Sequence, residues 1–155
     1  MSRQVHKTQP AHEVSMQYKP ECVCANLRRT ARAVSQLYDA ALADSGLKIT
    51  QFSLLRSIER NEPAPINVLA EEMELDRTTL ARNLQPLERD ELIILAAGSD
   101  KRVVEVRLTA AGREAIERAL PLWHATQRGI EKRLGAKFKA VLRDLADEVS
   151  ALARK

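Results

Sequence analysis

The apolar positions of this chain recur at helical spacing over most of its length. Between residues 20 and 46 they fall three and four positions apart, which predicts one long amphipathic helix. Gly46 is placed to end this helix, because glycine readily takes the left-handed conformation of a helix C-terminus. Two shorter helices are predicted next, one from an N-cap at Thr50 to Asn61 and one over residues 66–73.

Three further helices are predicted in the second half of the chain. Asp76 suits the N-cap of the first, because its carboxylate accepts from the free amides of an opening turn. Thr109 opens a long helix that Gly135 ends, and a last amphipathic helix follows. The helix after Asp76 has an apolar face made of leucines: Leu80, Leu84 and Leu87.

The period changes to two between Leu92 and Thr109. Residues 93–96 and 103–108 are therefore predicted to pair as a hairpin around a turn at residues 98–101. Pro63 and Pro65 are read as a stiff connector without secondary structure. The fold class predicted is mainly α with a small β-hairpin wing (α+β), and the order of elements is that of a winged helix-turn-helix.

Composition agrees with packed helices. The 155 residues are 45% hydrophobic but only 3% aromatic, and a net charge of +4 permits binding to nucleic acid. No apolar run approaches the roughly 20 residues of a bilayer span, and no signal peptide is recognisable, so we expect a cytoplasmic protein without a membrane partner. We predict no cofactor and no enzyme activity, because no catalytic grouping or phosphate-binding glycine loop is present.

The helix after Asp76 carries the candidate chemistry. At about 100° per residue, Thr78, Arg82 and Gln85 lie opposite its leucines, with Thr79 on the shoulder and Arg77 at the start. Hydroxyl, guanidinium and amide groups are the side chains that contact base edges and phosphates. Double-stranded DNA is therefore the expected partner. A merely solvated face is the alternative, and a winged-helix protein-interaction module is a further one.

The hairpin tip carries Lys101 and Arg102, which suit the DNA backbone or a narrow minor groove. Asp100 is assigned to holding Arg102 in place, with a simple turn-forming role as the alternative.

The Asp100-Lys101-Arg102 run and the segment VEVRLTAAGREAI, which enters the long helix, resemble the MarR family of winged-helix regulators. The resemblance implies a homodimer that binds a pseudo-palindromic operator, usually as a repressor released by a small molecule or an oxidant. It implies one domain over 20–155, with dimerisation helices at 20–46 and 109–155 and a DNA-binding lobe at 47–108. Residues 1–19 are polar with little periodicity and are therefore expected to form a flexible arm. Glu91 stands where the family usually has glycine, so we expect it in a conformation that glycine adopts more easily.

Cys22 and Cys24 are the candidate sensor residues. The segments CANL and RAVSQLY resemble the peroxide-sensing branch of the family, which makes Cys24 the sensing position and Tyr38 a supporting residue from the partner subunit. A second supporting tyrosine of that branch is replaced by Arg28. Independently of the resemblance, the positive end of a helix dipole favours the thiolate form of a cysteine in the first turn.

Three interpretations of the cysteines stay open: small buried residues, a redox switch, or capture of a soft metal or metalloid with help from His6 or His12.

The resemblance also implies a small-molecule pocket of the kind found in such dimers. An aromatic or phenolic ligand would suit the family. The pocket candidates are Arg32, Tyr38, Trp123 and His124. The residue types favour a different interpretation for two of them, with Trp123 as a core anchor and His124 as a surface residue.

Overall fold

The computed structural model describes residues 22–98 and 103–153, which form two compact units. One unit ends at Val34 and the other begins at Ser35, so that helix α1 (Val23–Ala41) starts in the first and finishes in the second. No helix in the described ranges combines the length and the apolar character that a bilayer span requires.

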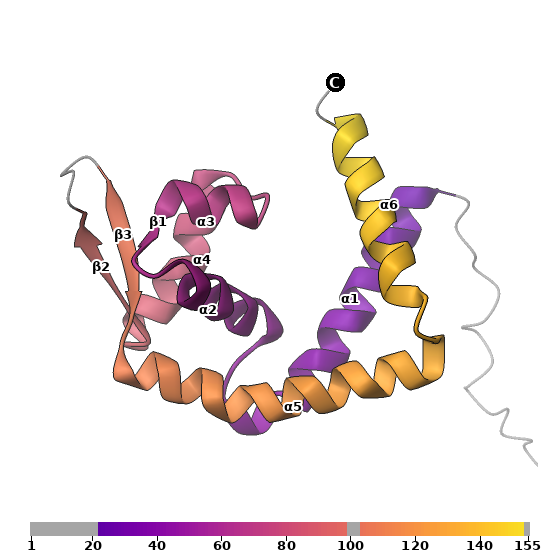
Figure 1. Ribbon diagram of the computed structural model, residues 1–155, viewed down its shortest axis with the longest axis horizontal. Helices are drawn as coiled ribbons and strands as arrows, with labels where there is room; N and C mark the ends of the chain where they lie inside the picture. Colours follow the sequence, from indigo (N-terminus) through magenta and orange to yellow (C-terminus); the bar gives the residue numbers. More distant parts are fainter. Residues whose placement is uncertain (1–21, 99–102, 154–155) are drawn as a thin grey trace, which may run out of the picture. The chain divides into compact units, whose positions relative to one another are not determined.

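The second unit contains the end of α1, the helices that follow it and a small sheet (Figure 1). The elements after α1 are η1 (Ala43–Ser45), α2 (Ile49–Asn61), β1 (Ala64–Pro65), α3 (Ile66–Glu72), α4 (Arg77–Arg89), β2 (Ile93–Ala97), β3 (Val104–Leu108), α5 (Ala110–Leu134) and α6 (Phe138–Ala153). The predicted fold class, mainly helical with a β-hairpin, is confirmed.

The sheet has three antiparallel strands in the order β1-β3-β2, so the interpretation of the proline segment as a mere connector is wrong. Ala64 pairs with Val106 across β1 and β3, while Ile93 pairs with Leu108 across β2 and β3. Pro65 is tolerated because β1 lies at the edge of the sheet, where an N–H can be absent without loss of a ladder bond. The predicted hairpin of β2 and β3 is confirmed.

Local capping signals predicted most helix ends. Gly46 has the expected left-handed conformation, with a φ of 78°, and its N–H donates to the Ala43 carbonyl at 3.0 Å. It caps the short helix η1, however, because α1 already ends at Ala41. Thr50 is not an N-cap, because α2 begins earlier, after Lys48. The amide of Ile49 donates to the carboxylate of Asp39 at 2.8 Å, so a side chain from the preceding helix satisfies the opening turn.

A single apolar core joins helices α2, α3, α4 and α5 to the sheet. Leu80, Leu84 and Leu87 are buried in it, which confirms the predicted inner face of α4. Trp123 packs against this core with its ring centre 6.0 Å from that of Phe52, as the core-anchor interpretation expected. The largest fully buried side chains include Leu42, Leu54, Leu55, Ile58, Leu69, Ile93, Val106 and Ile116.

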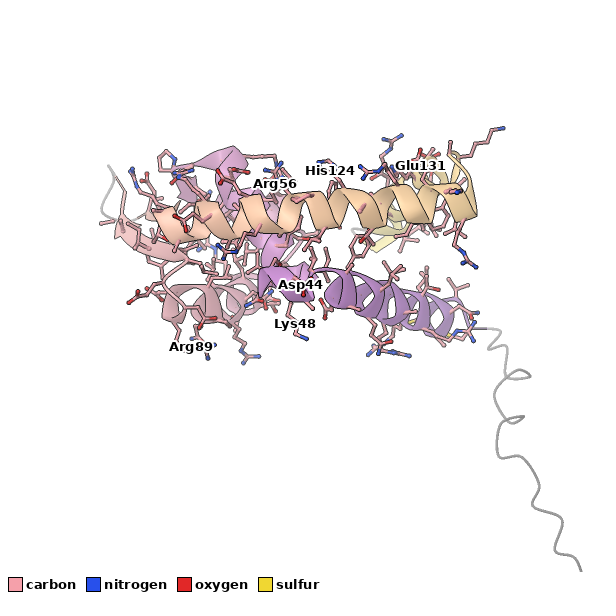
Figure 2. All side chains as sticks on the ribbon, turned by 90° about the horizontal axis from the view of Figure 1, so that it is seen from below. Asp44, Lys48, Arg56, Arg89, His124 and Glu131 are labelled. Carbon is pink, nitrogen blue, oxygen red and sulfur yellow. The ribbon has the colours of Figure 1, made fainter. Side chains whose placement is uncertain are left out.

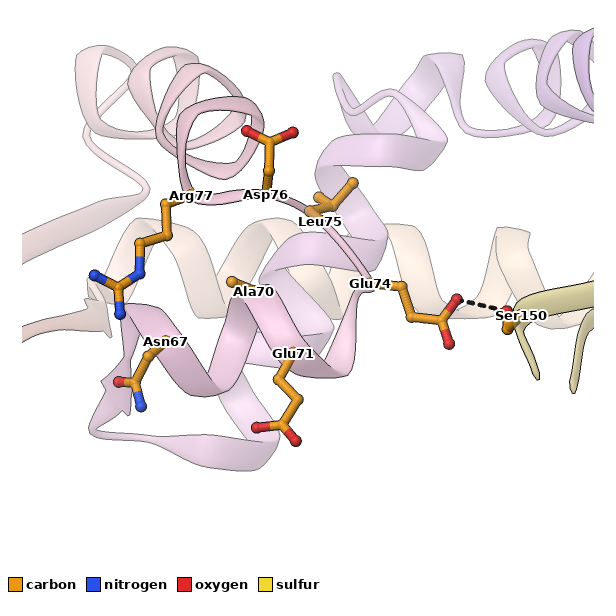
Figure 3. A pocket seen from close by; sticks show the side chains of 8 residues that line it. All are labelled: Asn67, Ala70, Glu71, Glu74, Leu75, Asp76, Arg77 and Ser150. Atoms are coloured by element: carbon orange, nitrogen blue, oxygen red, sulfur yellow. Dashed lines mark hydrogen bonds between the residues drawn. The ribbon is translucent and has the colours of Figure 1, made fainter. Parts of the chain in front are cut away.

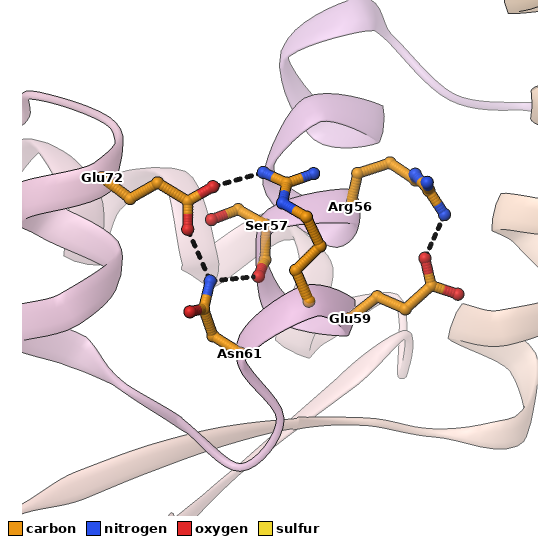
Figure 4. Close-up of polar contacts among 6 residues, drawn as sticks. Arg56, Ser57, Glu59, Asn61 and Glu72 are labelled. Atoms are coloured by element: carbon orange, nitrogen blue, oxygen red, sulfur yellow. Dashed lines mark hydrogen bonds and ion pairs between the residues drawn. The ribbon is translucent and has the colours of Figure 1, made fainter.

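A polar network on α2 and α3 holds these two helices together (Figure 4). The Glu72 carboxylate accepts from the Arg60 guanidinium and from the amide nitrogen of Asn61, which also donates to the Ser57 carbonyl at 2.9 Å. The hydrogen bond with Arg60 is the main reason why the pKa of Glu72 lies below its usual value. The network fixes α3, and therefore the turn that leads into α4.

Apolar side chains are also exposed at the two ends of the described chain. On α1, Val23, Leu27, Val34 and Leu37 are at least one-third exposed. On α6 the exposed apolar residues recur at helical spacing, namely Val141, Leu142, Leu145, Val149 and Leu152. Exposed apolar stripes of this length are typical of protein–protein interfaces.

Candidate nucleic-acid interface

The turn between α3 and α4 fixes where α4 begins. The amide of Leu75 donates to the Ala70 carbonyl at 2.9 Å, and Glu74 adopts a positive φ of 50°. Asp76 then caps α4, because its carboxylate accepts from the Thr79 amide at 2.9 Å. The same carboxylate accepts from the Thr79 hydroxyl at 2.6 Å. The predicted N-cap is thus observed, with a second bond that the sequence did not indicate.

The outer face of α4 has the composition expected of a DNA-reading surface. Thr78, Arg82 and Gln85 are exposed opposite the buried leucines, Thr79 is half-buried on the shoulder, and Arg77 is exposed at the start. Within the described residues neither Arg77 nor Arg82 forms an ion pair. Other arginines of the same unit are paired with carboxylates, namely Arg56, Arg60, Arg89, Arg107 and Arg113.

A guanidinium that forms no ion pair on an exposed helix face can use its N–H groups as hydrogen-bond donors to another molecule. Arginine presents five N–H donors in a fixed fork, a shape that suits two acceptors on guanine or two phosphate oxygens. Arg89, by contrast, points out at the far end of α4 (Figure 2), and its Nε lies 3.0 Å from a carboxylate oxygen of Asp90. The first half of α4 therefore carries the two guanidinium groups of this helix that form no ion pair within the described residues.

Asn67, at the start of α3, is a candidate that the sequence pattern did not single out. It is exposed and lines, together with Arg77, a cavity of about 350 Å³ beside β3. Figure 3 shows the Arg77 guanidinium on the side of Asn67 and the Asp76 carboxylate on the opposite side of the start of α4. The sequence signal that could have identified Asn67 is its position, as a side-chain amide in the first turn of α3.

A larger open cavity, of about 580 Å³, lies beside the same turn (Figure 3). Its lining includes the carboxylates of Glu71, Glu74 and Asp76, and Glu74 accepts from the Ser150 hydroxyl at 3.0 Å. Three carboxylates repel a phosphate group, so this cavity does not suit the DNA backbone.

The hairpin of β2 and β3 follows α4, and its tip lies outside the described residues. Asp100, Lys101 and Arg102 belong to this tip, and their roles stay predictions. The amide of Gly98 donates to the Val103 carbonyl at 2.8 Å, which shows that the two strands remain paired up to the turn. The backbone before the hairpin agrees with the expectation for Glu91, whose φ is 55°.

The candidate sensor residues belong to different units. Cys22 and Cys24 are exposed free thiols at the start of α1, so their own chain does not bury them. His6 and His12, proposed as helpers in metal binding, lie outside the described residues. Residues 22–98 and 103–153 contain no group of three or more His, Cys, Asp or Glu side chains arranged to hold a metal ion.

The ligand-pocket candidates are only partly suited to that role. Tyr38 is buried, and burial raises the pKa of its hydroxyl, an effect that the nearby charge of Lys139 opposes. Arg32 is exposed on α1. His124 is exposed on α5 (Figure 2). Its ring centre lies 5.0 Å from that of Trp123, in a T-shaped arrangement. Trp123 itself is engaged with the core, which leaves no observation that assigns these residues to a ligand.

Comparison with known proteins points in one direction. A model of the MarR family matches residues 45–103. The transcriptional regulator MosR of M. tuberculosis, crystallised with DNA, is 40% identical over 86% of this chain and 98% of its own, with a TM-score of 0.78. A variant of E. coli MarR in complex with operator DNA is 23% identical over 82% of this chain and 92% of its own, with a TM-score of 0.72. Among curated proteins, YhbI of Bacillus subtilis, an uncharacterised HTH-type transcriptional regulator, is 25% identical over 80% of this chain and 84% of its own.

Proposed function

The chain belongs to the MarR family of DNA-binding transcriptional regulators, and from that premise we propose that it is a homodimeric repressor of a pseudo-palindromic site. In this proposal α4 enters the major groove and the hairpin, with Lys101 and Arg102, contacts the neighbouring backbone or minor groove. Residues 47–108 form the DNA-binding lobe, while 20–46 and 109–155 supply the dimerisation helices. Solved relatives crystallised with DNA support the DNA-binding part.

The observation that carries the proposal is the exposed face of α4, on which Arg77 and Arg82 have no carboxylate partner in the described residues. Arg82→Ala is expected to weaken binding to a duplex selected from a randomised library by about 1–3 kcal/mol and to relax the base preference. Arg128→Ala, which removes an exposed arginine from α5, is the matched control and should leave both unchanged. Equal binding by the Arg82 variant and the wild type would exclude this face as the reading surface.

The dimer is supported by the apolar stripes of α1 and α6, which no other described element covers. We propose that a second copy of the chain packs against these stripes, because burial of apolar side chains between two subunits removes them from water. Leu145→Glu places a charge in the α6 stripe and should shift the sedimentation of the protein to that of a monomer. Arg143→Glu adds a carboxylate on another face of α6 and should leave the dimer intact.

Regulation by thiol oxidation is the proposed form of control, because Cys24 is exposed in the first turn of α1 with Cys22 just before it. A peroxide would oxidise the Cys24 thiolate to a sulfenic acid, and a second thiol would then displace water to give a disulfide. Peroxide should release DNA from the wild type but not from Cys24→Ser. If arsenite or a phenolic ligand releases the DNA and peroxide does not, the effector is that compound and not an oxidant.

A further inference from the structure

The hydroxyl group of Thr79 is held by the residue that caps its own helix. Its Oγ1 lies 2.6 Å from Oδ2 of Asp76, while Oδ1 of the same carboxylate accepts from the Thr79 amide at 2.9 Å. A carboxylate only accepts hydrogen bonds, so the threonine hydroxyl must be the donor. The pKa of Asp76 lies below its usual value, chiefly because of this hydroxyl, so the carboxylate is ionised at neutral pH.

This contact decides what Thr79 can offer to a neighbouring molecule. A hydroxyl has one hydrogen and two lone pairs, and here the hydrogen is committed to Asp76. The oxygen therefore presents itself to the outside as an acceptor only. Thr78 differs, because its hydroxyl has no partner within the described residues and can donate to a phosphate.

The position of Thr79 brings this acceptor toward base edges. It is the third residue of α4 and is half-buried on the shoulder of the proposed DNA-binding face. The N-terminal residues of a recognition helix are those that contact bases in the major groove. There adenine N6 and cytosine N4 are donors, whereas guanine N7 and O6 and thymine O4 are acceptors.

We propose that Thr79 is a specificity residue that accepts a hydrogen bond from the amino group of adenine or cytosine and rejects guanine and thymine on the strand that it faces. The proposal rests on the assignment of α4 as the DNA-reading helix. Asp76 acts as a positioning residue, since it sets the direction in which the Thr79 hydroxyl points.

The test compares base preferences of full-length proteins selected on a randomised duplex library. The wild type should show one position at which adenine or cytosine is favoured about tenfold over guanine or thymine. Thr79→Val keeps the branched shape but lacks the hydroxyl, and should lose the preference at that position alone. Thr79→Ser keeps the hydroxyl and should retain the preference.

Asp76→Asn supplies the sharpest arm of the experiment. Asparagine is as good an N-cap as aspartate, so its carbonyl oxygen should still accept from the Thr79 amide. Its NH₂ group would then donate to the Thr79 oxygen and release the hydroxyl hydrogen. The preference at the same position should change to guanine or thymine, with circular dichroism showing that the variant is folded.

Each outcome has a defined meaning. An unchanged library motif for Thr79→Val, or an unchanged preference in a folded Asp76→Asn protein, overturns the proposal. Arg82→Ala separates this failure from a failure of the reading face. If Arg82→Ala alters the motif while Thr79→Val does not, only the inference about Thr79 fails. If neither variant alters the motif, the assignment of α4 fails with it.

Discussion

The guanidinium of Arg113 donates to the carboxylate of Glu62, with Nη2 2.5 Å from Oε2, and thereby joins the end of α2 to the first turns of α5. The other oxygen of the same carboxylate accepts from the backbone amide of Leu108 at 3.0 Å. One side chain thus fixes the junction at which β3 passes into α5. This junction connects the DNA-binding lobe to the helix proposed to join it to the dimer.

Glu62→Gln tests the electrostatic part of this junction. Glutamine can still accept from the Leu108 amide, but it removes the negative charge beside Arg113, so we expect a loss of about 1 kcal/mol in the free energy of unfolding. Glu62→Ala also leaves the amide without its acceptor and should lose about 2 kcal/mol. Urea denaturation measures both. If Glu62→Ala unfolds at the same urea concentration as the wild type, the junction does not depend on Glu62.

Gly112→Ala tests a close approach between backbones. A Cβ atom at this position would lie 2.1 Å from the carbonyl oxygen of Leu92, which cannot move without disturbing the start of β2. We expect a loss of about 3 kcal/mol in the free energy of unfolding.

Gly129→Ala is the matched control on the same helix. An added Cβ there meets nothing within 4 Å, and alanine favours a helix by about 0.5–1 kcal/mol over glycine. Both substitutions replace glycine by alanine, but they should change the free energy of unfolding in opposite directions. Thermal or urea unfolding that gave them the same sign would contradict the packing around Gly112.

Glu91→Gly should stabilise the protein, because Glu91 holds a left-handed backbone conformation with a φ of 55°. Relief of that strain exceeds the extra chain entropy of glycine, which gives a net gain of about 0.5–1 kcal/mol. Glu91→Ala retains a Cβ and should gain none of it. The comparison of these two variants by urea denaturation isolates the backbone effect, and equal midpoints would rule it out.

Signals between neighbouring residues allowed much of the fold to be predicted. The cap at Asp76, the left-handed Gly46 and the unusual backbone of Glu91 all depend on positions a few residues apart. The inner and outer faces of α4 follow equally from helical periodicity. Local signals alone therefore predict the start of α4 and the two faces of this helix in the candidate site.

Contacts between distant segments could not be predicted in the same way. Glu62 meets partners 46 and 51 positions away, and nothing in the local sequence indicates this. The start of α2 was misplaced because Asp39, ten residues earlier, satisfies the Ile49 amide. The strand at Ala64 was missed because its pairing with Val106 gives the segment its regular structure. For Thr79 the helix position was predictable, but the hydrogen bond from its hydroxyl was not.

Glu72 predicts a pH dependence of stability. Its pKa in the folded protein lies below the usual 4.5, chiefly because its carboxylate accepts from Arg60. Folding therefore favours the ionised form, so the stabilisation is present above the unfolded pKa and is lost as the pH falls through the folded one. Because the carboxylate is about one-third exposed, we expect less than about 1 kcal/mol at neutral pH. Urea denaturation of wild type and Glu72→Gln should show a gap in the free energy of unfolding near pH 7 that narrows as the pH falls below the unfolded pKa of Glu72 and through its folded pKa. A gap of constant size across this range would mean that hydrogen-bond geometry, and not charge, joins α3 to α2.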